Sequence, residues 1–129
     1  MIRPKYRFFH RIYLALEGLA VAVKREKHMR IHLIISILLL TPALFFPVTP
    51  THFWMLLILL TFLIILELMN TAIETTIDLV TRRFSYRAKL AKDMASAAVL
   101  LNAILVGLFS IFIYGRGMYN FVIGVIVGH

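Results

Sequence analysis

Cysteine is absent from the 129 residues, and acidic residues are scarce: six Asp and Glu stand against fourteen Lys and Arg. The missing cysteine excludes disulfides, thiol chemistry and cysteine-based zinc sites. Apolar residues make up 61% of the chain, whereas soluble proteins contain roughly 45–50%. A short chain that is both basic and strongly apolar indicates one membrane-embedded domain over residues 1–129, close to anionic lipid. A nucleic-acid binder is the second interpretation of the same composition.

Long apolar runs predict an all-α integral membrane protein with three transmembrane helices, over about 30–48, 53–80 and 94–114. The second run spans a bilayer only if its helix continues through an acidic stretch to Val80, and Pro42 should kink or end the first. Residues 6–28 place apolar side chains on one stripe with cations beside it, which predicts an amphipathic helix in the membrane interface. The apolar tail 115–129 is too short to predict a fourth span.

Basic residues indicate the orientation of these helices. They are frequent before the first span and in the link between the second and third, whereas the turn near residue 50 has none and only Arg116 follows the third span. The positive-inside rule therefore predicts a cytoplasmic N-terminus and an external C-terminus. No cleavable signal peptide is expected, because charges recur through Arg30 before any long apolar run.

The stretch "ELMNTAIETTID", residues 67–78, places four polar side chains where the helix should still be in lipid: Glu67, Asn70, Glu74 and Asp78. Offsets of 3, 7 and 11 residues put them on one helical stripe. Carboxylates in or near the membrane cost several kcal/mol each unless they meet cations or water. With the basic link nearby, the stripe could hold a divalent cation bridged to phosphates. Spacing alone leaves phosphate chemistry, ion transport and helix packing all open.

Two sequence blocks resemble a known signature. "ELMNTAIETTIDLV", followed by "AKLAKDMASAAVLL", is similar to the motif of the prokaryotic diacylglycerol kinase family, small three-span membrane kinases that include the undecaprenol kinases. Asp78 and Asp93 keep the family's fifteen-residue separation. "ALEGLAVAVKREKHMRIH" matches the family's segment before the first span more loosely. The similarity covers about residues 7–113.

The resemblance implies an ATP-dependent lipid kinase of the bacterial inner membrane, active in phospholipid biosynthesis as a homotrimer whose protomers share active sites. It makes Glu67 the general base that takes the proton from the lipid hydroxyl, and Glu26 and Glu74 the ligands of magnesium on ATP. It gives further roles to other positions: Asn70 and Asp78 orient these groups; Lys92, Asp93, Arg83 and Ser85 bind the nucleotide; Arg7 lies near ATP and Ser96 near the lipid.

The acceptor predicted from the resemblance is undecaprenol, which would become undecaprenyl phosphate, because "RIH" in "EKHMRIH" resembles the undecaprenol-preferring branch. Diacylglycerol, giving phosphatidic acid, is the alternative. Two features depart from the family pattern: His28 stands where undecaprenol-kinase-like members often have Asn, and the link "TRRFSYR" is more basic than usual. They bear on nucleotide affinity and loop contacts, not on the reaction.

Other functions fit the sequence less well. A non-enzymatic oligomer could line a cation pathway with the three carboxylates of the stripe, but such a pathway has no evident need for "AKD" at the membrane surface or for Glu26 on a separate helix. His28 and His32, an i, i+4 pair near Glu26, could form a zinc site, although a polar interfacial face is favoured. No nucleic-acid partner is expected, because aromatic and aliphatic neighbours of the N-terminal cations favour membrane.

Overall fold

The computed structural model describes residues 8–45, 48–81 and 83–127, and this part of the chain is helical without a strand. Its elements are α1 (Phe8–Arg25), α2 (Lys27–Leu40), the 3-10 turn η1 (Thr41–Leu44), α3 (Pro50–Val80) and α4 (Tyr86–Val127). Within it, three helical segments are long and apolar enough to cross a membrane: Lys27–Leu44, Pro50–Val80 and Tyr86–Gly117. The predicted fold class, three membrane-spanning helices preceded by an N-terminal helix, is confirmed.

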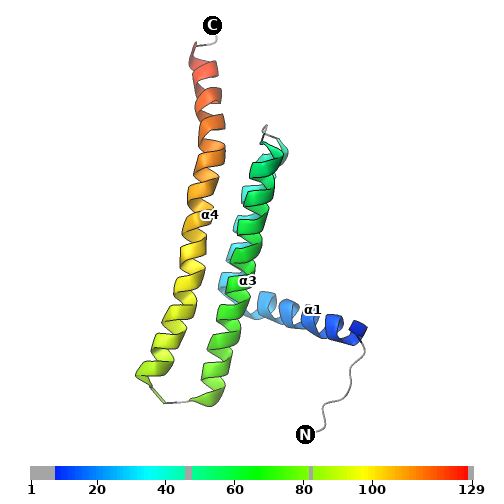
Figure 1. The fold of residues 1–129 in the computed structure, drawn as a ribbon, viewed down its shortest axis with the longest axis vertical. Coiled ribbons are helices and arrows are strands. Elements are labelled where there is room, and N and C mark those ends of the chain that lie inside the picture. The colour runs from blue at the N-terminus through cyan, green and yellow to red at the C-terminus, as the bar shows by residue number, and fades with distance from the viewer. Residues whose placement is uncertain (1–7, 46–47, 82, 128–129) are drawn as a thin grey trace.

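The helices form an antiparallel bundle from which α1 projects sideways (Figure 1). α3 packs against α4 over most of its length, and α2 packs on α3. α1 is separated from α2 by Glu26 alone, whose extended backbone (φ −94°, ψ 121°) breaks the helix. This break lets α1 lie across the direction of the bundle, which is the arrangement that an interfacial amphipathic helix requires.

The hairpin between α2 and α3 is specified by its prolines. α2 ends at Leu40, and Pro42 lies in the 3-10 turn that follows, since proline cannot donate the hydrogen bond that would continue an α-helix. Thr49 caps α3 by accepting a hydrogen bond from the backbone N–H of His52 at 3.4 Å. Pro50 occupies the first turn, where its missing N–H costs nothing.

α3 runs without interruption through the polar stretch to Val80, as the required length of the second span predicted. Its threonines satisfy their hydroxyls within the helix: Thr75 Oγ1 donates to the carbonyl of Thr71 at 2.8 Å and Thr76 Oγ1 to that of Ala72 at 2.7 Å. With 31 residues, α3 is about 46 Å long. The acids therefore lie on the same continuous helix as the apolar segment that precedes them.

The link between α3 and α4 is shorter than the sequence suggested. α4 begins at Tyr86, so Lys89, Lys92 and Asp93 lie on its first turns and not on a connecting segment. α4 also continues through the apolar tail to Val127. The tail thus extends the last helix instead of forming an element of its own, and α4 projects beyond the end of α3 (Figure 1).

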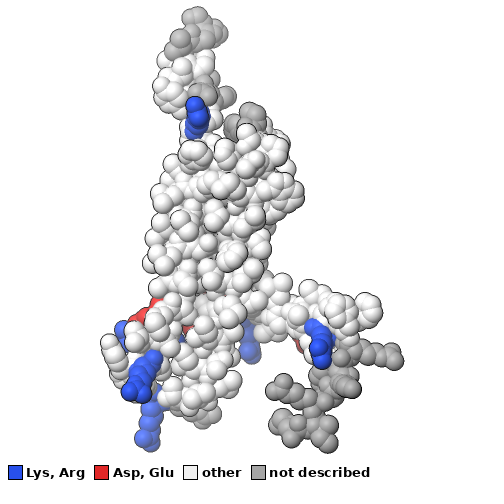
Figure 2. Space-filling model, viewed as in Figure 1, with Lys and Arg blue, Asp and Glu red and all other residues white. Residues whose placement is uncertain are grey.

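The bundle is apolar outside as well as inside. Leu56 and Leu60 of α3 pack with Val106 of α4 in the buried core. Large apolar side chains also cover the outer faces, such as Ile58 at 57% and Leu101 at 65% exposure, which suits lipid and not water. Figure 2 shows Lys and Arg gathered at the end of the bundle near α1 and the α3–α4 link, with a white surface above them.

Candidate functional site

A cavity of about 280 Å³ lies between α2, α3 and α4 and is called the acidic cavity here. Three carboxylates reach it from the α1–α2 junction and from α3. Apolar side chains of α4 form part of its wall. Its lining residues are Glu26, His28, His32, Glu67, Asn70, Thr71, Glu74, Ser96, Val99, Leu100 and Ala103. The three helices thus bring the predicted base and both predicted magnesium ligands to one cavity.

Glu67 is the most deeply buried acid of the stripe, with 4% of its surface exposed. Its Oε2 lies 3.7 Å from Nε2 of His32 on α2. Glu74, two turns later on α3, is half-buried, and about 10 Å separates the two residues along the helix axis. The separation is too long for both carboxylates to ligate one metal ion directly, so the two acids are suited to different tasks.

Asn70 connects the stripe to α4. Its Nδ2 donates to Oε1 of Glu74 at 3.2 Å, and its Oδ1 accepts a hydrogen bond from Oγ of Ser96 at 3.4 Å. Asn70 is 9% exposed, so the bridge lies inside the helix interface. The contacts suit the orienting role predicted for Asn70, because one oxygen of Glu74 is fixed while its carboxylate faces the cavity.

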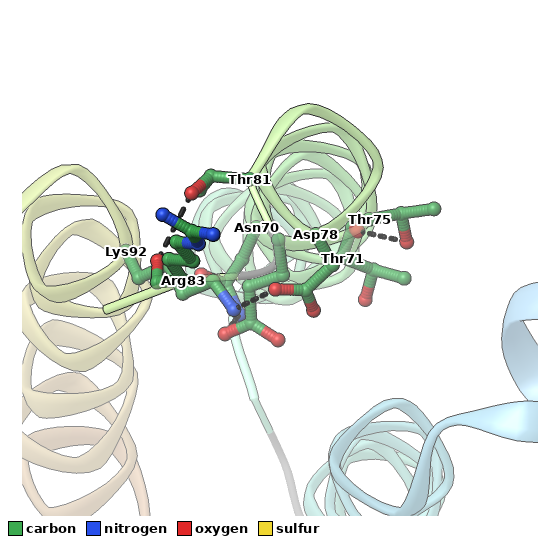
Figure 3. Close-up of polar contacts among 8 residues, drawn as sticks. Asn70, Thr71, Thr75, Asp78, Thr81, Arg83 and Lys92 are labelled. Carbon is green, nitrogen blue, oxygen red and sulfur yellow. Dashed lines mark hydrogen bonds and ion pairs between the residues drawn. The ribbon is translucent and has the colours of Figure 1, made fainter. Parts of the chain in front are cut away.

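A second cavity, called the link cavity, has a volume of about 390 Å³ and lies where α3 passes into α4. Across it Lys92 Nζ of α4 pairs with Oδ1 of Asp78 on α3, and Lys89 Nζ pairs with Oδ2 of Asp93 at 3.1 Å. Figure 3 shows Asp78 and Asn70 on α3 and Lys92 reaching from α4. The lining is Ile77, Asp78, Thr81, Arg83, Phe84, Ser85, Ala88, Lys89, Lys92 and Asp93.

The predicted site residues divide between the two cavities. Glu26, Glu67, Asn70, Glu74 and Ser96 line the acidic cavity, and Asp78, Arg83, Ser85, Lys92 and Asp93 line the link cavity. Arg7 lies outside the described residues. A site shared between protomers would have Lys92 meet the acidic stripe across a subunit boundary, but in the single chain Lys92 already pairs with Asp78.

A third cavity, called the apolar groove, lies between α1 and α3 and has a volume of about 650 Å³. Its walls are mainly aliphatic, including Leu19 and Met69, and it shares the lining residues Glu26 and Thr71 with the acidic cavity. This groove was not predicted from the sequence. The apolar stripe of α1 was visible, but its partner on α3 depends on how the helix turns at Glu26.

The acidic cavity is lined by both carboxylates that were predicted to hold magnesium. In the described ranges no three His, Asp or Glu side chains are grouped so that they could hold a metal ion, which gives no support to the zinc alternative of His28, His32 and Glu26. Magnesium needs only one or two carboxylates, with substrate oxygens and water completing the shell. Glu26 and Glu74, which line the same cavity, are a donor set of that kind.

The contact of His32 with Glu67 was not predicted from the sequence, where this histidine was interpreted as a zinc ligand, as part of a polar face and as part of the "RIH" stretch that resembles the undecaprenol-preferring branch. Its signal in the sequence is slight: a single histidine in "RIHLIIS", at the start of the first apolar run. A polar residue that enters an apolar helix needs a partner, and the partner, 35 positions later, is found only when α2 and α3 are packed together.

The chain is similar in sequence to known membrane lipid kinases. The family model for prokaryotic diacylglycerol kinase matches residues 13–114. A diacylglycerol kinase of Helicobacter pylori strain J99 is 36% identical over 120 residues, covering 89% of this chain and 90% of that protein. A diacylglycerol kinase of Synechocystis is 35% identical over 91 residues, 70% of this chain and 52% of that protein.

An undecaprenol kinase of Bacillus subtilis is 30% identical over 99 residues, which covers 77% of this chain and 80% of that protein. The family resemblance predicted from the two sequence blocks is thereby confirmed, and so is the class of enzyme, a membrane lipid kinase rather than a non-enzymatic cation pathway. The family model covers most of the chain, both sequence blocks and all three cavities. This chain belongs to the prokaryotic diacylglycerol kinase family.

Proposed function

We propose that this lipid kinase transfers the γ-phosphoryl group of ATP to the hydroxyl of a membrane lipid alcohol, with Glu67 as the general base. The lipid oxygen attacks the γ-phosphorus while its proton passes to the Glu67 carboxylate. The bond between the γ-phosphorus and the β–γ bridging oxygen breaks, and ADP leaves. General-base assistance of this kind contributes about 10²- to 10⁴-fold to a rate.

The observation that carries the proposal is the position of Glu67. It is 4% exposed, lies on the lipid-spanning helix α3, and opens on the same cavity as Glu26 and Glu74. The apolar groove between α1 and α3 adjoins this cavity, because Glu26 and Thr71 line both, and it would give a lipid hydroxyl an apolar route toward Glu67. A phosphate donor can approach from the other end of the stripe, where the basic residues lie (Figure 2).

Magnesium would be held by Glu26 and Glu74, and when bound it would neutralise charge on the phosphate groups of ATP. The hydrogen bond from Asn70 to Glu74 sets the direction of that carboxylate. Lys92 and Asp93, with Arg83 and Ser85 of the link cavity, are the proposed nucleotide contacts. In this arrangement the Asp78–Lys92 pair opens, or shares its lysine, when phosphate arrives.

The preferred acceptor in this proposal is undecaprenol. The prediction rests on the stretch "EKHMRIH", and the structure places Glu26 and His32 of that stretch in the lining of the acidic cavity. Diacylglycerol is the second candidate, because the relatives from Helicobacter pylori and Synechocystis carry the name diacylglycerol kinase. Hydrocarbon contacts discriminate weakly between lipids, so turnover of both is expected, with undecaprenol the faster.

The proposed setting is the bacterial inner membrane, with the N-terminus in the cytoplasm, the C-terminus outside and residues 1–129 acting as one domain. Most of the Lys and Arg visible in Figure 2 lie at the end of the bundle that holds α1 and the α3–α4 link, and α4 ends at the opposite side (Figures 1 and 2), which agrees with the positive-inside rule for this topology. The proposed assembly is a homotrimer with active sites shared between protomers.

The test is a phosphoryl-transfer assay with purified protein in mixed micelles, using radiolabelled ATP and magnesium with undecaprenol or diacylglycerol in parallel. Labelled lipid phosphate is expected with both acceptors and at the higher rate with undecaprenol. A Glu17→Gln variant, which removes an exposed carboxylate of α1, should behave as the wild type. A clear preference for diacylglycerol overturns the acceptor assignment, and no lipid phosphate with either acceptor overturns the proposed reaction.

A further inference from the structure

His32 is the polar neighbour of the most buried acid in the molecule. Its Nε2 lies 3.7 Å from Oε2 of Glu67, and the two side chains are 16% and 5% exposed. Across residues 8–45, 48–81 and 83–127, no other side chain forms an ion pair or a hydrogen bond with Glu67. Burial disfavours a carboxylate that has no polar partner, so the imidazole beside Glu67 is the side chain that can offset this cost.

The imidazole is itself held from one side only. Its Nδ1 is buried and has no hydrogen-bond partner in the described part of the chain. The backbone carbonyl of His32 accepts a hydrogen bond from Ser36 Oγ at 2.7 Å, which belongs to the helix and does not orient the ring. The 3.7 Å contact with Glu67 is therefore the only polar interaction of the imidazole ring in the described part of the chain.

We propose that His32 is a positioning residue that holds the Glu67 carboxylate toward the lipid hydroxyl. Nε2 carries its proton toward Oε2, which leaves Oε1 as the oxygen that accepts the proton from the substrate. The proposal rests on the base role proposed above for Glu67. It assigns to α2 a part in the chemistry, whereas every other residue proposed to act on the reacting groups comes from α3, α4 or the α1–α2 junction.

The proposed reaction needs a carboxylate with a fixed direction, and the contact with His32 can supply it. Glutamate has three side-chain torsions, and among the described residues no side chain other than His32 pairs with the Glu67 carboxylate to select one rotamer. Misplacing a reacting group by about 1 Å costs on the order of 100-fold in rate. A histidine on a neighbouring helix can fix the direction of the carboxylate without a permanent positive charge. A permanently charged side chain at this place would hold Glu67 in an ion pair and make it a weaker base.

The experiment compares His32→Leu, His32→Gln and, as a matched control, His52→Leu. His52 is a half-buried histidine at the other end of α3 and packs against Phe109 and Phe112. His32→Leu is expected to lower kcat about 100-fold while KM for ATP and lipid changes less than about threefold. His32→Gln keeps an amide donor and should recover most of kcat. His52→Leu should keep the wild-type kcat.

A second readout does not depend on turnover. In protein labelled with ¹⁵N at histidine, Glu67→Gln should shift the Nε2 resonance of His32 and leave that of His52 in place. Unchanged kcat in His32→Leu, equal losses in the Leu and Gln variants, or an unshifted His32 resonance would each overturn the positioning role. A rise in lipid KM at constant kcat would make His32 a lipid contact instead. If the wild type phosphorylates no lipid, the proposed function fails while the resonance shift still reports on the pair.

Discussion

Removing the charge of Glu67 and removing that of Glu74 should impair different steps of the proposed reaction. Glu67→Gln keeps the size of the side chain and removes the proton acceptor. We expect kcat to fall by about 10²- to 10⁴-fold, the range that general-base assistance supplies, with magnesium-dependent ATP affinity nearly unchanged. Glu74→Gln removes a carboxylate ligand of a hard cation and should weaken nucleotide binding only when magnesium is present.

The different surroundings of Glu67 and Glu74 are the reason for expecting different effects. Glu67 is 4% exposed and faces His32, whereas Glu74 is half-buried and is held by Asn70 at 3.2 Å. The residues are seven positions apart, or about 10 Å along α3. A change at Glu67, the proposed base, can therefore leave Glu74, the proposed metal ligand, in place, because no hydrogen bond joins the two carboxylates among the described residues.

The assay is a nucleotide titration of both variants with and without magnesium, paired with single-turnover transfer to the lipid. Glu17→Gln serves as the charge-matched control, because it removes one exposed carboxylate from α1. Loss of ATP binding in Glu67→Gln, together with intact binding in Glu74→Gln, would show that base and metal ligand are assigned the wrong way round. Equal loss in both variants would mean that the cavity acts as one unit.

Three further predictions concern assembly, nucleotide contact and packing. Inactive Glu67→Gln and Asp93→Asn chains, mixed and reassembled, should regain activity if protomers share sites; no recovery in verified mixed oligomers would place each site within one chain. Lys92→Met should raise the KM for ATP several-fold with little loss of stability, since the partly exposed pair with Asp78 is worth at most about 1 kcal/mol; an unchanged KM removes Lys92 from the nucleotide site. Asn102→Leu, which removes the 3.1 Å hydrogen bond from α4 to a carbonyl of α3, should destabilise the bundle by about 0.5–1.5 kcal/mol in a denaturant titration; a stability equal to the wild type would show that this bond contributes nothing.

The fold class could be predicted from the sequence because each spanning helix is indicated by the residues within it. Apolar runs set the spans, Pro42 ends the first, and the apolar residues between Glu67 and Asp78 show that α3 continues. The same periodicity placed the acids on one face. Helix periodicity does not encode how two helices pack against each other.

That limit explains what was missed. The pairs His32–Glu67 and Asp78–Lys92 join positions 35 and 14 residues apart, and both depend on the relative rotation of neighbouring helices. The early start of α4 at Tyr86 was missed because its first turns are as basic as a surface loop. The apolar groove between α1 and α3 depends on the interruption of the helix at a single residue, Glu26.

The unbroken α3 has a mechanical consequence for the enzyme. The rise of the helix puts Glu67 about 21 Å and Glu74 about 32 Å from Phe53 along α3, so if the hydrocarbon begins at Phe53, a core of roughly 30 Å ends between the two acids. The helix cannot shorten, and Glu67, the proposed base, therefore stays at a fixed distance from Phe53 while bilayers differ in thickness. In a thicker bilayer the substrate hydroxyl would lie further from Glu67 unless α3 tilts or the lipid deforms. Acyl-chain length of the surrounding lipid thus becomes a variable that sets the turnover rate.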